Sequence, residues 1–188
     1  MTLQLKVGDV ILFNYTEYAT NKWARRLLEL QERIDDGKAN HVGIYAGNGK
    51  ILESGWQGVV FSSHVISDNP LCAVLRLKKI VNENEMNEII SKYYESHKDL
   101  GYSYKGLISA AVSTTIGFIT WVATAGKIRY KPVLFKEEAA PFCSEAVAEI
   151  YEEYTGNKFE VDNDVISPND LARATRFEKI QKFGGENE

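Results

Sequence analysis

The chain has 188 residues, of which 44% are hydrophobic and 26% are charged, and its formal net charge at pH 7 is −4. This composition is typical of a globular protein, and we expect residues 1–188 to form a single domain, with a core over about residues 6–175 and a polar tail over residues 176–188. The negative charge argues against nucleic acid as a partner and gives no reason to expect binding to an anionic membrane.

The cysteine content and the first residues of the chain indicate a reduced, cytoplasmic protein. Cys72 and Cys143 make neither a metal-ligand spacing nor a disulfide framework. Residues 1–6 lack the long apolar stretch of a signal peptide. No cluster of His, Asp or Glu has the spacing of metal ligands, and no glycine-rich loop leads into a helix, so we expect neither a metal nor another cofactor.

The first part of the chain predicts a strand, a helix and a hairpin, in that order. Residues 6–13 form a turn that leads into an apolar strand. Residues 21–35 carry apolar side chains at helical spacing, which predicts a helix whose apolar stripe belongs to the core. Residues 41–46 and 50–54 flank the turn 47–49 and predict a hairpin. The apolar stripe consists of Trp23, Leu27, Leu30 and Ile34.

The rest of the chain adds two strands and three helices. Strands are predicted over residues 58–61 and 73–77, and helices over residues 84–97, 144–154 and 169–175. Since the strands follow one another through short connections, we expect an α+β fold in which helices pack against an antiparallel sheet.

An uncharged stretch, Gly106–Gly126, lies between Lys105 and Lys127 and is long enough to span a bilayer. Several Ser and Thr residues and an internal glycine, Gly117, favour one or two buried helices instead. A surface that faces a membrane or binds lipid is the alternative interpretation, and the sequence leaves both open.

Cys143 is a candidate nucleophile because it lies where a loop turns into a helix, directly after Pro141 and Phe142. A helix N-terminus and a neighbouring imidazolium both lower the pKa of a thiol. His41, at the start of an apolar strand, is the candidate base. On the local sequence alone, Cys143 is equally well interpreted as a small buried hydrophobic residue.

The other titratable residues of these types are weaker candidates. Cys72 enters an apolar strand and is predicted to belong to the core. His64 lies in a polar loop and His97 at a helix end, and both are predicted to be solvated. Few pairings therefore compete with that of Cys143 and His41.

Glu53 is the candidate for a group that orients the imidazole. Residues two apart in a strand share a face, and a loop of odd length or a bulge pairs Gly43 with Glu53, which brings the carboxylate to the face of His41. A two-residue turn at Asn48 and Gly49 without a bulge turns the carboxylate away, and Glu53 is then a solvated strand charge. Asn40 is the alternative polar partner of the imidazole.

The order of the motifs resembles that of the circularly permuted NlpC-type cysteine hydrolases, the YiiX-like branch of the papain-like superfamily. In the permuted members the strands with the His and the acid precede the helix with the Cys, as they do here. Ser167–Leu171 resembles the element that closes the domain in this branch, so the resemblance covers about residues 6–175. The motifs that carry it are Gly8–Phe13, His41–Tyr45, Ile51–Ser54, Tyr102–Tyr104 and Phe142–Glu145.

The resemblance implies a small, barrel-like antiparallel sheet packed against helices, with Cys143 as nucleophile, His41 as base and Glu53 as third member of the site. It further implies substrate contacts from Tyr102, Tyr104 and Ser144, although Ser103 stands where members of the family often carry an acid. The implied activity is a thiol hydrolase that cleaves an amide or ester bond of a small peptide or amino-acid-containing substrate, such as a cell-wall fragment.

Two other functions fit the same residues. One is an acyltransferase or phospholipase that acts on lipid acyl groups, with the stretch 106–126 in contact with the lipid. The other is a catalytically inactive binding module on the same fold. The sequence defines neither the substrate nor the oligomeric state.

Overall fold

The computed structural model describes residues 4–35, 37–55, 57–63, 71–100, 141–161 and 166–182. The expectations for the uncharged stretch 106–126, for Tyr102 and Tyr104, and for His64 lie outside the described residues. In the part of the chain that is described, no helix combines the length and the apolar character needed to cross a bilayer.

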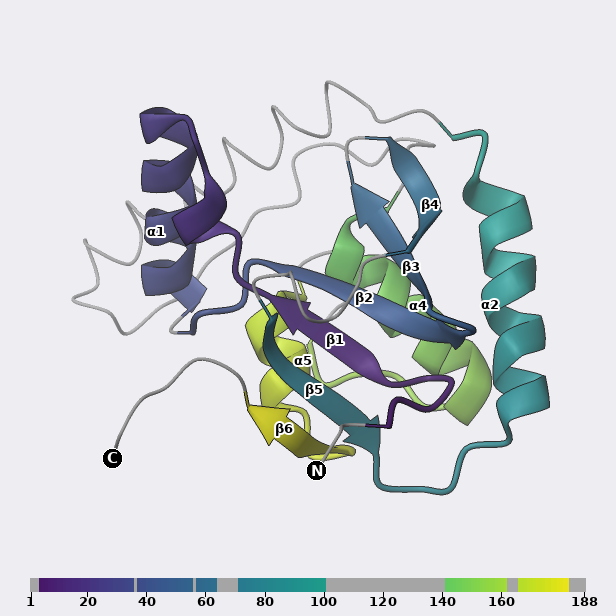
Figure 1. Cartoon of the computed structure of the whole chain (residues 1–188). Coiled ribbons are helices and arrows are strands. Elements are labelled where there is room, and N and C mark those ends of the chain that lie inside the picture. The colour runs from purple at the N-terminus through teal and green to yellow at the C-terminus, as the bar shows by residue number, and fades with distance from the viewer. Residues whose placement is uncertain are drawn as a thin grey trace.

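The strands form one six-stranded sheet in the order β4-β3-β2-β1-β5-β6, and every neighbouring pair is antiparallel (Figure 1). The predicted antiparallel sheet is therefore confirmed. The order is open, with β4 and β6 at its two edges, and no pairing between described strands closes it into a barrel. The strands are β1 (Val10–Phe13), β2 (His41–Gly47), β3 (Lys50–Gly55), β4 (Gly58–Ser62), β5 (Leu71–Leu77) and β6 (Phe177–Lys182).

The predicted helices are confirmed, with bounds that differ from the expected ones by one or two residues. α4 packs on β2 and β3, and α2 lies against α4 and β4. α1 stands on the opposite side of the molecule from α2 (Figure 1). The helices are the short 3-10 turn η1 (Thr16–Tyr18), α1 (Lys22–Asp35), α2 (Glu83–His97), α4 (Cys143–Thr155) and α5 (Pro168–Arg173).

The two faces of the sheet bury alternate residues of each strand. Val42 and Ile44 of β2 belong to the larger cluster, with Val147 and Tyr151 of α4. The fully buried Tyr151 also donates a hydrogen bond from its hydroxyl to the carbonyl of Gly8, which fixes α4 to the turn before β1. The opposite face holds a smaller cluster that consists of Ile11, Phe13, Ile51 and Val74.

Two expectations were wrong. Trp23 is 73% exposed and not part of the core, because η1 is the element among the described ones against which α1 mainly packs. Residues from Phe177 to Lys182 are not tail but the edge strand β6, paired with β5. The two apolar residues of this strand, Phe177 and Ile180, are three positions apart and pack on opposite faces of the sheet, so no period-two pattern marks the strand. The charged residues between and around them are typical of edge strands.

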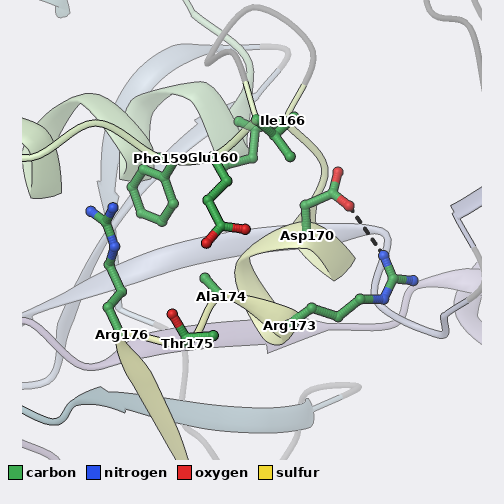
Figure 2. Close-up of a pocket in the computed structure, with 9 residues that line it drawn as sticks. Phe159, Glu160, Ile166, Asp170, Arg173, Ala174, Thr175 and Arg176 are labelled. Carbon is green, nitrogen blue, oxygen red and sulfur yellow. Dashed lines mark hydrogen bonds and ion pairs between the residues drawn. The ribbon is translucent and has the colours of Figure 1, made fainter.

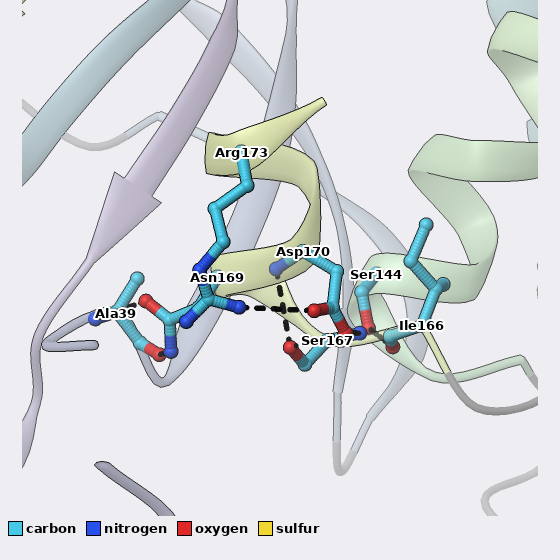
Figure 3. Close-up of polar contacts among 7 residues, drawn as sticks. All are labelled: Ala39, Ser144, Ile166, Ser167, Asn169, Asp170 and Arg173. Carbon is cyan, nitrogen blue, oxygen red and sulfur yellow. Dashed lines mark hydrogen bonds and ion pairs between the residues drawn. The ribbon is translucent and has the colours of Figure 1, made fainter. Parts of the chain in front are cut away.

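Asn169 ties α5 to the segment that precedes His41. Its side-chain oxygen accepts a hydrogen bond from the Ala39 N–H at 3.1 Å, and its side-chain nitrogen donates to the Ala39 carbonyl at 2.8 Å (Figure 3). Both residues are buried. Ser167 caps the same helix and exchanges hydrogen bonds with Asp170, so α5 presents Asn169 in a fixed position.

The substitution Asn169→Ala removes both hydrogen bonds and leaves the buried N–H and C=O of Ala39 unpaired. We expect it to lower the free energy of unfolding by about 2 kcal/mol, measured by urea denaturation. The exposed Asn84 on α2 provides the control, since Asn84→Ala changes an amide of the same size without a buried partner and is expected to stay within about 0.5 kcal/mol. Equal effects of the two substitutions would contradict the role of Asn169.

Candidate active site

The register of the β2–β3 hairpin places Glu53 beside His41. Asn48 and Gly49 form the turn, both with positive φ, as type I′ turns require. The turn has two residues, but the pairing shifts by one position between Tyr45 and Gly47, so that Gly43 pairs with Glu53. The pairing predicted from the sequence is thus confirmed, and a bulge at Ala46 produces it.

Both oxygens of the Glu53 carboxylate are held. Oε2 lies 2.7 Å from Nε2 of His41, and because an ionised carboxylate can only accept, the imidazole donates this hydrogen bond. Oε1 accepts a hydrogen bond from the hydroxyl of Ser62 on β4. The glycine at position 43 is required here, since a Cβ atom would come within 3.0 Å of Cγ of Glu53. The carboxylate is therefore fixed from two sides.

Cys143 is the first residue of α4, after the N-cap Phe142. The hydroxyl of Ser54, next to Glu53 on β3, donates to the carbonyl of Pro141 and so anchors the start of the helix to the strand. The side chain of His41 and the backbone N–H groups of Val42 and Ser144 lie close enough to the sulfur to lower the pKa of the thiol. Since Nε2 of His41 faces Glu53, Nδ1 is the ring nitrogen left for the sulfur.

The charges of this group support one another. Burial alone disfavours the imidazolium, but the neighbouring Cys143 sulfur and Glu53 carboxylate outweigh it and raise the pKa of His41 to about 10. Burial also disfavours the thiolate, but the charge and hydrogen bond of His41 and two backbone N–H groups outweigh it and lower the pKa of the Cys143 thiol. Raised and lowered in these directions, the two pKa values favour a thiolate–imidazolium pair at neutral pH.

Tyr15 lies at the site and was missed by the sequence analysis. Its ring centroid is 5.6 Å from that of His41, and its ring stacks on Phe13. Burial and the charges of Glu53 and Cys143 raise its pKa to about 12, so its hydroxyl stays neutral and can donate a hydrogen bond. The signal was available in principle, because pairing β1 with β2 brings Phe13 opposite His41, and Tyr15 follows two residues later.

Asn40, the alternative partner of the imidazole, has another role. Its side-chain oxygen accepts from the N–H of Tyr15 at 2.9 Å, and its side-chain nitrogen donates to the hydroxyl of Thr16 at 2.9 Å. The Thr16 hydroxyl in turn donates to Glu32 of α1. Asn40 therefore holds the segment after β1, and with it Tyr15, while Glu53 takes the imidazole.

The remaining candidates lie apart from this group or are used elsewhere. Ser144 is buried, and its hydroxyl donates to the carbonyl of Ile166 at 2.7 Å (Figure 3), so its N–H, rather than its hydroxyl, faces the sulfur. His97 ends α2 and stacks on Tyr93 at 4.1 Å between ring centroids. The backbone of Cys72 lies in β5 as predicted, and its side chain falls outside the description.

A pocket of about 230 Å³ lies between the end of α4, α5 and the start of β6, and neither His41 nor Cys143 lines it (Figure 2). Arg173 pairs with Asp170 at 3.1 Å at its rim. Arg176 donates to two backbone carbonyls and stacks on Phe159 at 3.8 Å from the ring centroid. Both arginines of the pocket are thus already paired within the protein. The pocket therefore offers no alternative to the site at Cys143.

No family model and no curated protein matches the chain. It is similar to a solved structure, the crystal structure of the metalloprotein yiiX from Escherichia coli O157:H7, with a TM-score of 0.60. The chain has a YiiX-like fold. The match covers 96% of this chain and 99% of the other, at 14% sequence identity, and at this identity the likeness extends to the fold alone.

That protein is described as a metalloprotein, but the described residues of this chain do not offer the ligands of a metal site. Among the described residues, no group of three His, Cys, Asp or Glu side chains lies together in a way that could hold a metal ion. The potential ligands at the site interact with one another instead: Glu53 is hydrogen-bonded to His41, and His41 interacts with the thiol of Cys143. No catalytic step in this chain is therefore derived through a metal.

The lowered pKa of Cys143 predicts an unusual pH dependence of thiol alkylation. Because the imidazolium of His41 stabilises the thiolate and lowers the pKa of the thiol, we expect the rate of reaction with iodoacetamide to fall much less than tenfold per pH unit between about pH 8 and about pH 6. In His41→Gln the imidazolium is lost, and the rate should fall about tenfold per unit below pH 8. Mass spectrometry of the labelled peptide separates Cys143 from Cys72. A tenfold slope in the unchanged protein would disprove the ion pair.

Proposed function

We propose that the chain is a thiol hydrolase of the permuted papain-like type, which cleaves an amide or ester bond of a small peptide or amino-acid-containing substrate. The observation that carries this proposal is the juxtaposition of Cys143, His41 and Glu53, in which the thiol lies at a helix N-terminus and the neighbouring imidazole is hydrogen-bonded to a carboxylate. A nucleophile, a base and an orienting group in this sequence are the components of nucleophilic catalysis on a carbonyl.

The first half-reaction forms an acyl-enzyme. The Cys143 thiolate attacks the carbonyl carbon, a C–S bond forms, and the carbonyl oxygen takes up the negative charge. As the tetrahedral intermediate collapses, the C–N or C–O bond breaks, and the leaving group takes the proton from Nδ1 of His41. Glu53 holds Nε2–H throughout, so the ring keeps Nδ1 directed at the reacting atoms.

The second half-reaction releases the acid. His41, now neutral, takes a proton from a water molecule that attacks the thioester. The C–S bond then breaks, the acyl group leaves as a carboxylic acid, and the thiolate–imidazolium pair is restored. The charge state favoured in the resting site is thus the one from which each cycle starts.

Two hydrogen-bond donors are suited to stabilise the oxyanion. The N–H of Cys143 belongs to the first turn of α4, where no carbonyl of the same helix can accept it. The hydroxyl of Tyr15 has no hydrogen-bond partner among the described residues. Both lie beside the thiol, and donors placed before the reaction stabilise a developing charge without reorganisation.

The substitution Cys143→Ala is expected to abolish hydrolysis and to leave the fold intact, because a small, partly buried group is replaced by one of similar size. The assay uses a panel of amino-acid amides, esters and short peptides, including cell-wall fragments, with EDTA present throughout. His41→Gln should be inactive as well, while His97→Gln, whose imidazole interacts with Tyr93 and Ser96, serves as the matched control. If the Cys143→Ala protein still hydrolysed a substrate of the panel, the proposal would be wrong.

The substitution Tyr15→Phe keeps the ring against His41 and removes only the hydroxyl. If this hydroxyl stabilises the oxyanion, kcat should fall about a hundredfold with little change in KM. The pH profile of Cys143 alkylation should stay as it is, since the hydroxyl acts on the substrate and not on the thiolate. A loss confined to KM, or an altered alkylation profile, would assign Tyr15 to another role.

A further inference from the structure

The surface at the start of α1 combines exposed aromatic and basic side chains. Trp23 is 73% exposed and Tyr18 is 60% exposed, which is unusual for side chains of this size. The exposed Lys22, Arg25 and Arg26 lie around them, and the guanidinium of Arg26 lies 5.6 Å from the centroid of the Trp23 ring. These five residues are called the α1 surface below.

The basic residues of the α1 surface lie where a helix does not favour them. The first turn of α1 contains no acidic residue, although the N-terminus is the positive end of the helix dipole and disfavours cations. The exposed pair of Arg25 with Glu29 at 3.1 Å offsets little of this, since surface ion pairs are weak. Glu17 is the acidic residue next to the group, so the basic residues still outnumber it. The arrangement gains nothing within the helix and indicates an anionic partner.

The chemistry of the α1 surface fits the boundary of an anionic bilayer. Trp and Tyr concentrate at the level of the lipid headgroups, where an apolar ring with a polar edge is best accommodated. Lys and Arg are attracted by anionic headgroups while their alkyl stems cover apolar surface. We propose that the α1 surface binds an anionic lipid bilayer peripherally, although the chain as a whole carries a net charge of −4.

The α1 surface is connected to the candidate site. η1, which contributes Tyr18, directly follows Tyr15 in the chain. At the other end of α1, Glu32 accepts hydrogen bonds from Thr16 and from Asn40 at 3.4 Å, and Asn40 also holds Tyr15. A bilayer bound to α1 therefore lies in a defined orientation relative to Cys143. The binding itself is independent of the proposed hydrolase activity, and its test uses no substrate.

The test is co-flotation of the whole chain with vesicles of phosphatidylcholine alone or with phosphatidylglycerol added. We expect binding to the anionic vesicles at low salt and its loss at high salt. The double substitution Arg25→Glu and Arg26→Glu should lower partitioning at least about thirtyfold, since each basic residue near an anionic surface contributes about fivefold. Trp23→Ala should weaken binding at low salt and leave the slope of its salt dependence unchanged, because it removes an apolar contact and no charge.

The control makes the same change of charge elsewhere. Lys78 and Lys79 are exposed in the connection from β5 to α2, beside Ile80, which is 93% exposed. Lys78→Glu with Lys79→Glu should leave vesicle binding within about threefold, because only remote charge is altered. An equal loss in both double variants, equal binding to neutral vesicles, or no binding at all would overturn the proposal. A preference for duplex DNA over anionic vesicles would likewise exclude lipid as the partner.

Discussion

The register of the β2–β3 hairpin is the constraint on which the candidate site depends. Successive residues of a strand point to opposite faces, so a shift of one position would direct Glu53 away from His41. The bulge at Ala46 takes up the odd residue, and Gly43 leaves space for the carboxylate on the strand opposite. A backbone feature without chemistry of its own thus decides whether the imidazole has an acidic partner. The same strand carries Ser54, which fixes the start of α4, so the hairpin also sets the position of the thiol.

The thiolate of Cys143 and the imidazolium of His41 each stabilise the charged form of the other. Burial disfavours both the Cys143 thiolate and the His41 imidazolium, and the attraction between them, together with Glu53 and the backbone N–H groups of Val42 and Ser144, reverses both preferences. Removal of either partner leaves the other with the cost of burial and without its counter-charge. Effects of substitutions at Cys143, His41 and Glu53 are therefore not additive, and Cys143 and His41 titrate as a pair rather than as separate groups.

Features set by local patterns could be predicted from the sequence, and features set by long-range packing could not. Hydrophobic periodicity and the turn residues were sufficient for α4 and the hairpin, because these depend on neighbours in the chain. They left two registers open for Glu53, and the bulge at Ala46 decides between them. Tyr15 follows a strand without any motif, and only the pairing of β1 with β2 brings it to His41. Trp23 has the spacing of a core residue, but spacing does not show whether another element covers that face. β6 lacks the continuous apolar run of a central strand, because it is an edge.

The net charge of the chain likewise does not show which molecules a particular part of its surface binds. The total of −4 is a sum, whereas a bilayer interacts mainly with charges within about a Debye length, roughly 10 Å. Lys22, Arg25 and Arg26 lie together on one turn of α1, and the acidic residues of α2 and α4 lie on other elements. Asn40 and Glu32 connect α1 to the segment that carries Tyr15. Helix α1 and the residues around His41 therefore belong to one structural unit. A protein with an acidic total charge can therefore still present a basic surface on the helix that is connected to Tyr15.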